Sequence, residues 1–413
     1  MTFRRRTTAI VASLCVIGAA GCTAAPLPTS VAVTPTPATR PSAPVEASAP
    51  PSASSGALAS GSPHKGLSTE IEIQRLDPAL AHSVLEFASD GVSIIYSSAM
   101  AEDSGSGAAP DLWRYDLEPS AAPKVVWRNP NRDHSIVKLD GDVGTLMFVD
   151  MPLSGAAEWD LWLLPQVGVE PILLDTHPGD DDVSSLVPSF SISEGIVAWT
   201  AFDRGAAGPV SQLLVAETPE WRPRVIDERP AAEAELWLPS LYGHRLVYTE
   251  VRYSADRSSD ERSVHYVELG APEPPRRLDT SGRATMPLLV GDIVYWKEAD
   301  PGFNMFNWGR IFRYDLAADK VSPVSLWPQE YVNYPSAGAR FLAWRGADAF
   351  KFGVYDMIRE QARLIESYSA ESQANVLRPH IRGDLMVWMY VETLDGSEYS
   401  ELRWARMPDK SVP

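Results

Sequence analysis

The residues best suited to binding a ligand lie together in one segment of the sequence. Residues 297–309 interleave aromatic and amide side chains. Aromatic rings beside amides suit stacking on a sugar ring or gripping a peptide. The alternative is that these rings cap the core of their own sheet. The candidate ligand-binding residues are Phe303, Asn304, Phe306 and Trp308.

A second segment carries consecutive carboxylates, Asp180, Asp181 and Asp182. Clustered carboxylate oxygens are the ligands that Ca²⁺ takes in proteins. The three residues lack the alternating spacing of a calcium-binding loop, which favours a solvated turn. They are weak metal candidates, and we predict that the protein holds no metal.

Histidines offer a third kind of site. His134 and His177 fall near corresponding loops of two repeats, and His380 follows Pro379. Three converging histidines would hold a metal ion, but no paired spacing supports such a site. We predict no cofactor. The sequence contains no G-x-S-x-G nucleophile motif, and we assign no catalytic residue.

The elements that position these residues follow from an internal repeat. Seven apolar runs each follow a turn containing Gly and end in an aromatic residue. A period of about 50 residues with strand-like content is typical of a β-propeller blade. The runs do not alternate, as expected for middle strands that neighbouring blades cover on both faces. The aromatic residues are Tyr96, Phe148, Trp199, Tyr248, Trp296, Trp344 and Trp388.

Glycine and proline mark the turns and the first strand of the repeats. A Gly before each apolar run suits a hairpin turn with positive φ. Pro cannot donate to a β-ladder, so the Pro at the entry of five repeats belongs on an edge strand facing the centre of the ring. The glycines are Gly91, Gly144, Gly195, Gly243, Gly291, Gly338 and Gly383, and the prolines are Pro188, Pro239, Pro287, Pro335 and Pro379.

Two more strand-like segments follow most of the apolar runs, which predicts four-stranded antiparallel blades. The seventh repeat ends before its fourth strand, whereas residues 70–77, EIEIQRLD, match the fourth-strand pattern and precede the first repeat. We therefore predict an all-β, seven-bladed β-propeller over residues 68–410. Its ring is closed by the N-terminal strand joining the last blade, which leaves no open sheet edge.

The repeats resemble the TolB-like propellers over roughly residues 70–407. Residues 88–98, ASDGVSIIYSS, followed by 111–117, DLWRYDL, look like that family's Asp-Gly turn, apolar strand and Asp-aromatic-Tyr-Asp-Leu strand. The resemblance implies a docking scaffold outside the cytoplasm. The extra α/β domain of TolB and the hydrolase domain of the related prolyl peptidases have no counterpart in this sequence.

The N-terminus predicts export and lipidation. Residues 1–21 combine three arginines with a short apolar stretch, which is typical of a signal peptide and too short to span a bilayer. The run AAGC, ending at Cys22, resembles the bacterial lipobox, which implies a lipid on Cys22. The alternative is an ordinary cleaved signal. Residues 22–67, rich in Pro, Ala, Ser and Thr, are predicted to be a disordered tether.

Charge and cysteine content restrict the partners. The net charge of −18 repels phosphate backbones and anionic headgroups, which argues against nucleic acid and against peripheral membrane binding by the propeller. Cys15 and Cys22 are the two cysteines, so the predicted propeller has no disulfide. We expect a monomer on the extracytoplasmic side of the cell membrane, anchored through Cys22.

The function expected from these features is non-catalytic. A tethered propeller without a catalytic constellation would bind or scaffold an envelope protein or a cell-wall glycan. The alternative is a propeller enzyme, a glycan hydrolase or lyase, with groups gathered from different blades at the channel mouth. Loop carboxylates and histidines that converge in a pocket, with raised carboxylate pKa values, would favour the enzyme, and scattered, exposed acids would favour binding.

Overall fold

The computed structural model divides the chain into two units, Met1–Gly66 and Leu67–Pro413. All described residues belong to the second unit. They consist of β-strands, turns and loops, and none of them belongs to a helix that could cross a membrane. The described residues are 71–76, 84–98, 111–118, 121–131, 133–154, 158–166, 168–179, 186–255, 259–299, 309–326, 331–346, 351–368, 374–394 and 397–407.

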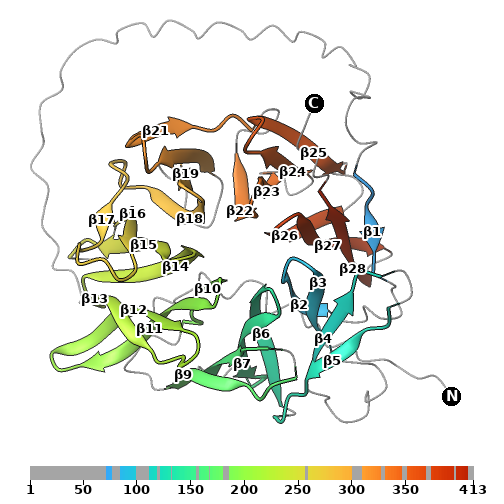
Figure 1. Ribbon diagram of the computed structural model, residues 1–413, viewed down its shortest axis with the longest axis horizontal. Helices are drawn as coiled ribbons and strands as arrows, with labels where there is room; N and C mark the ends of the chain where they lie inside the picture. The colour runs from blue at the N-terminus through green and yellow to red at the C-terminus, as the bar shows by residue number, and fades with distance from the viewer. Residues whose placement is uncertain are drawn as a thin grey trace, which may run out of the picture. The chain divides into compact units, whose positions relative to one another are not determined.

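Antiparallel four-stranded sheets follow one another along the chain and surround a common centre (Figure 1). The first is β2 (Val84–Ser89), β3 (Ser93–Ser98), β4 (Asp111–Asp116) and β5 (Lys124–Trp127). The second is β6 (His134–Asp142), β7 (Thr145–Pro152), β8 (Glu158–Leu164) and β9 (Ile172–Pro178). The third is β10 (Phe190–Ser193), β11 (Ile196–Gly205), β12 (Gly208–Glu217) and β13 (Arg224–Pro230). The fourth is β14 (Ala234–Tyr242), β15 (Arg245–Tyr253), β16 (Asp260–Glu268) and β17 (Arg276–Arg277).

The remaining blades follow the same plan. The fifth is β18 (Ala284–Val290), β19 (Ile293–Ala299), β20 (Gly309–Asp315) and β21 (Lys320–Pro323). The sixth is β22 (Val332–Ala337), β23 (Phe341–Gly346), β24 (Lys351–Asp356) and β25 (Gln361–Ser367). One residue pair, Gly309 with Val332, joins these two blades into an eight-stranded sheet. The seventh is β26 (Ala374–Arg382), β27 (Leu385–Leu394) and β28 (Ser397–Arg406), completed by β1 (Gln74–Arg75).

The predicted closing strand is confirmed. Gln74 and Arg75 pair antiparallel with Trp404 and Arg403 of β28. The Leu76 N–H donates to the Leu402 carbonyl at 3.0 Å, and the Leu76 side chain is buried. The N-terminal strand therefore supplies the outer edge of the last blade.

Hydrophobic burial lies between blades. The described residues form seven buried apolar clusters, one at each junction of neighbouring blades, including the junction of the seventh blade with the first. All seven repeat aromatics are at most 1% exposed. This confirms the prediction that they are core residues, and it explains why the middle strands lack alternation.

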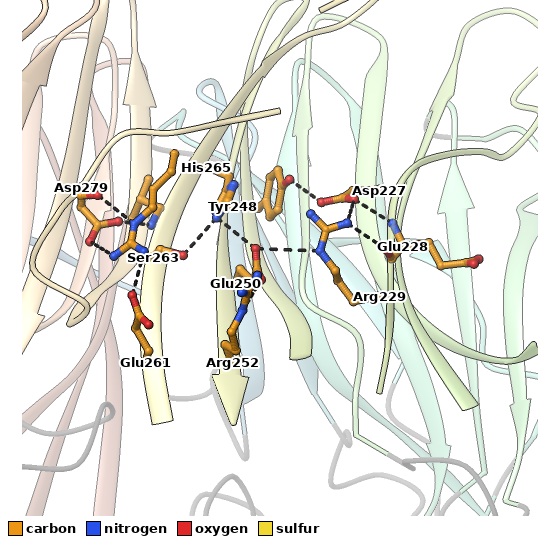
Figure 2. Close-up of polar contacts among 12 residues, drawn as sticks. Asp227, Glu228, Arg229, Tyr248, Glu250, Arg252, Glu261, Ser263, His265 and Asp279 are labelled. Carbon is orange, nitrogen blue, oxygen red and sulfur yellow. Dashed lines mark hydrogen bonds and ion pairs between the residues drawn. The ribbon is translucent and has the colours of Figure 1, made fainter. Parts of the chain in front are cut away.

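A polar contact recurs at several of these junctions. The buried aromatic of one blade donates a hydrogen bond to an acid on the outermost strand of the preceding blade. We call this contact the acid–aromatic tie. The ties are Trp199 Nε1 to Asp175 Oδ2 at 2.9 Å, Tyr248 Oη to Asp227 Oδ2 at 2.6 Å (Figure 2), and Trp388 Nε1 to Glu366 Oε2 at 2.7 Å.

At three other junctions the repeat aromatic does not bind an acid of the preceding blade. Trp127 takes the acid's position before Phe148, which has no donor, and the two rings pack at 4.7 Å. Trp296 donates to Glu298 of its own strand. Trp344 Nε1 is buried and finds no hydrogen-bond partner among the described residues.

The prediction of positive φ at the repeat glycines holds for all but one of them. Six of the seven glycines have positive φ, as expected. For Gly338 the expectation is wrong, because its φ is not in the left-handed region. Its requirement is close approach: a Cβ there would lie 2.5 Å from the Gly383 carbonyl oxygen of the next blade.

Four of the predicted edge prolines lie within the innermost strands β14, β18, β22 and β26, where the ladder register shifts. The residue before each Pro has positive φ, although none of the four is Gly. A bulge of this kind re-aims the side chain. The four residues are Leu238 (φ 52°), Met286 (φ 54°), Tyr334 (φ 46°) and Arg378 (φ 42°).

We predict that Trp199→Phe destabilises the protein more than Trp344→Phe, by about 1–3 kcal/mol, because only the first leaves a partly buried acid, Asp175, without its donor. Both substitutions remove the same ring from a fully buried site. Denaturant unfolding of the two variants measures the difference. Equal losses of unfolding free energy would show that the acid–aromatic tie does not stabilise the junction.

Candidate functional site

Most sequence candidates lie outside the described residues. These are the lipidation site Cys22, the carboxylates Asp180, Asp181 and Asp182, and the aromatic-amide set Phe303, Asn304, Phe306 and Trp308. Their roles remain predictions.

The three histidines do not converge. His134 Nδ1 lies 2.9 Å from Asp150 Oδ2, and the His177 ring stacks on Trp159. His380 contacts Asp140 instead. Within the described ranges, no group of three or more His, Cys, Asp or Glu is arranged to hold a metal ion.

The structure reveals a different site on the innermost strands, at the residue ten positions before each repeat aromatic. In the fourth to sixth blades this position holds Leu238, Met286 and Tyr334, and in the third Ser189. In the seventh, first and second blades it holds Arg378, Glu86 and Lys138. This position is therefore uncharged in the third to sixth blades and charged in the seventh, first and second.

Glu86 and Arg378 join the first and seventh blades through an ion pair. The Arg378 side chain remains 38% exposed, whereas that of Glu86 is 11% exposed. Burial raises the pKa of Glu86, and the neighbouring Arg378 charge only partly offsets this effect. Glu86 is thus easier to protonate than an ordinary glutamate.

Lys138, on β6, has no carboxylate within ion-pairing distance in the described structure. Its Nζ donates to the Pro188 carbonyl at 3.1 Å and lies 5.1 Å from the centre of the Phe190 ring. Burial lowers the pKa of Lys138 to about 8, although Glu86 opposes this effect. An amine with this pKa is partly neutral near neutral pH and suited to accept a proton.

Asp140, two residues along β6, lies beside two groups from the seventh blade. Its Oδ1 is 3.1 Å from His380 Nε2 and 3.3 Å from Arg382 Nη2. Burial would raise the pKa of Asp140, but the Arg382 charge and the His380 hydrogen bond outweigh burial and lower it. The pKa values of Asp140 and Glu86 are therefore moved in opposite directions, and Asp140 loses its proton at a lower pH than Glu86.

Hydrogen bonding fixes the tautomer of His380. The Ser89 backbone N–H donates to His380 Nδ1 at 3.1 Å, so Nδ1 carries no proton. The proton is then on Nε2, which donates to Asp140. Three blades thus contribute to one connected group, the inner cluster, which comprises Glu86, Lys138, Asp140, Arg378, His380 and Arg382.

Three of the six residues of the inner cluster could have been identified from their spacing in the sequence. Counting ten residues back from each repeat aromatic reaches Glu86, Lys138 and Arg378. The contacts between them depend on the register shifts of β2, β6 and β26. Hydrophobic periodicity does not report those shifts.

Comparison with known proteins supports the fold. No family model and no curated protein matches the sequence. An oligogalacturonate lyase from Vibrio parahaemolyticus is similar in structure, with a TM-score of 0.53, 11% identity, and coverage of 83% of this chain and 96% of that chain. An oligogalacturonate lyase in complex with manganese has the same TM-score and identity, and 93% of its chain is covered. The propeller domain of the Trilobed protease from Pyrococcus furiosus has a TM-score of 0.51, 10% identity, and coverage of 80% and 96%.

These neighbours correct one expectation. The tether, the closed ring and the lack of a catalytic constellation in the sequence predicted a non-catalytic binding or scaffold domain, and that prediction is wrong. The match covers 93% and 96% of the two lyase chains, which are named as enzymes. In those proteins nearly the whole chain is therefore propeller, with no large catalytic domain beside it. At 10–11% identity the likeness establishes that this chain is an all-β propeller.

Lys297 provides a control for the energetics of Lys138. It is fully buried on β19, and its Nζ donates to Asn333 Oδ1 at 3.1 Å. Burial, with a smaller contribution from Arg262, lowers its pKa to about 7. Below this pKa the folded state holds a buried charge, whereas the unfolded lysine is charged up to about pH 10.4.

We therefore predict that the stability of the protein increases between about pH 7 and pH 10.4 through Lys297, because the unfolded state binds more protons there. Lys297→Met removes this contribution. The increase in Tm caused by the substitution is expected to be larger at pH 6 than at pH 9. A gain independent of pH would contradict a charged Lys297 in the fold.

Proposed function

We propose that the protein is a glycan-cleaving propeller enzyme whose reaction centre is the inner cluster. The observation that carries this proposal is a half-buried amine of lowered pKa, Lys138, which lies close enough to the Arg378 guanidinium of another blade to feel its charge. A lysine with a purely structural role would be expected to pair with a carboxylate, and Lys138 has none within ion-pairing distance among the described residues. The names of the lyase neighbours indicate the substrate class, an acidic glycan built from uronic acids.

The chemistry that fits these groups is β-elimination from a uronate. Arg378 and Arg382 are each partly exposed, so they can pair with the sugar carboxylate in addition to their own acids. Neutralising that carboxylate makes the adjacent C5–H more acidic. Bidentate guanidinium pairing also fixes the orientation of the carboxylate.

Lys138 then acts as the base. Its neutral Nζ removes the C5 proton, the C4–O4 bond breaks, and a C4=C5 double bond forms in the sugar. The leaving O4 requires a proton, which Glu86 supplies because burial raises its pKa. The proton from C5 remains on Lys138. Before the next cycle Lys138 returns it to solvent and Glu86 takes one proton back, so the protons balance and the step needs no other reactant.

Hydrolysis is the second candidate, and one observation favours it. Glu86 and Asp140 have pKa values moved in opposite directions, as in the acid and base pair of a glycosidase. The two mechanisms give different products. Elimination yields an unsaturated sugar, and hydrolysis yields none.

We further propose that the enzyme is held outside the cytoplasm by a lipid on Cys22. The AAGC run and the Pro-rich residues 22–67 support this location. The TolB-like repeat pattern is consistent with an extracytoplasmic propeller.

Incubation of the full chain with polygalacturonate and with oligogalacturonates is expected to release new reducing ends together with ultraviolet absorbance from the C4=C5 bond. Reducing ends without absorbance would indicate hydrolysis through Glu86 and Asp140. If neither signal rises above that of heat-inactivated protein, the proposed function is wrong for this substrate class.

The activity is expected to rise with pH through about 8, because only the neutral Lys138 amine accepts a proton. Lys138→Arg keeps a cation but removes the base, and we expect at least a hundredfold lower kcat. Lys297→Met is the matched control, which removes a buried lysine outside the cluster and should retain activity. An unchanged pH profile in Lys138→Arg would exclude this residue as the base.

A further inference from the structure

A pocket of about 80 Å³ lies on the face of the fourth blade that packs against the third. Its lining comes from three adjacent strands. Figure 2 labels the lining residues of two of them, β15 and β16. The lining residues are Glu250 and Arg252 of β15, Glu261, Ser263 and His265 of β16, and Arg277 of β17. A pocket without apolar side chains selects a polar ligand, and this volume admits only a few non-hydrogen atoms.

The equivalent space in the seventh blade is filled. His265 is paired across the strands with Tyr248, as Arg403 is with Trp388. The Arg403 guanidinium lies 3.8 Å from the centre of the Tyr390 ring and also binds Glu366 and Glu401. The fourth blade has smaller groups at the matching positions, and a pocket remains.

One wall of the pocket is a buried carboxylate. Glu250 is 2% exposed and accepts from Arg252 Nη2 at 2.6 Å. Its Oε2 lies 3.0 Å from His265 Nε2, and Ser263 Oγ lies at the same distance from that nitrogen. A hydroxyl and an acid on one ring nitrogen do not make a catalytic triad, so this arrangement suits binding.

The second ion pair joins Arg277 Nη1 to Glu261 Oε1 at 2.7 Å. Arg277 also binds the backbone carbonyl of Asp279 at 2.8 Å, which fixes the guanidinium at the edge of the pocket. Both members of this pair are partly exposed, so they can exchange partners with a ligand at small cost.

The charges determine the ligand class. A simple anion in this pocket would face Glu250 and Glu261, and a simple cation would face Arg252 and Arg277. A molecule that carries both charges a short distance apart can place its negative group against the arginines and its positive group against the glutamates. His265, which lines the pocket, also has a buried Nδ1 with no hydrogen-bond partner in the described part of the chain.

We propose that this pocket binds a small zwitterion of the α-amino acid class. The ligand carboxylate binds the guanidinium groups of Arg252 and Arg277. Its ammonium binds the carboxylates of Glu250 and Glu261. This site is separate from the inner cluster and independent of the proposed glycan cleavage.

The test is titration of the full chain with glycine, alanine and serine, and separately with acetate and methylamine as single-charge probes, followed by calorimetry and by Tm. The zwitterions are expected to bind saturably and to raise Tm. Acetate and methylamine at the same concentrations should bind at least tenfold more weakly. Equal binding by a single-charge probe, or no binding by any of the three amino acids, would overturn the proposal.

Two variants locate the binding. Glu261→Gln removes one exposed charge and should weaken zwitterion binding about tenfold, whereas Glu217→Gln, in an exposed pair with Arg224 on another blade, should leave it unchanged. The double variant Glu250→Tyr/His265→Arg introduces the Tyr and Arg that fill this space in the seventh blade and should abolish binding. Unaltered affinity in Glu261→Gln would place the ligand elsewhere, even if the double variant failed to fold.

Discussion

Burial of one aromatic side chain between each pair of neighbouring blades is the constraint on which the rest of the structure depends. Each aromatic lies in an apolar cluster shared by two sheets. At three junctions its ring donor is also satisfied by an acid from the blade before it. Where the aromatic has no donor, as at Phe148, the acid is replaced by Trp127. An apolar ring in place of the acid is expected there, because a buried carboxylate without a hydrogen-bond donor would destabilise the fold.

The junctions fix the innermost strands, and those strands carry the inner cluster. Four inner residues, Leu238, Met286, Tyr334 and Arg378, adopt positive φ immediately before Pro, at a cost of about 1–3 kcal/mol each. The surrounding sheets hold them in this conformation. Register shifts on neighbouring strands bring Glu86, Lys138 and Arg378 from three blades into electrostatic contact.

The fold could be predicted because the repeat consists of residue patterns that each specify a strand or a turn locally. Apolar runs, the Pro at the entry of five repeats and the fourth-strand match of residues 70–77 all lead to the closed ring that the structure has. Gly338 differs because its constraint comes from a neighbouring blade, at Gly383. The inner cluster was missed for the same reason. Its residues are ordinary charged residues in sequence, and only the ring brings them together.

The expectation of a scaffold failed because it took the lack of a catalytic constellation in the sequence as evidence against catalysis. A site shared among Lys138, Glu86 and Arg378 has no local sequence motif, since each residue comes from a different repeat. The most direct measurement of the central claim is an experimental structure of the Lys138→Arg variant with a galacturonate oligomer. The account predicts a uronate carboxylate bound to Arg378 and Arg382, with C5 facing residue 138. An oligomer bound away from the innermost strands would contradict it.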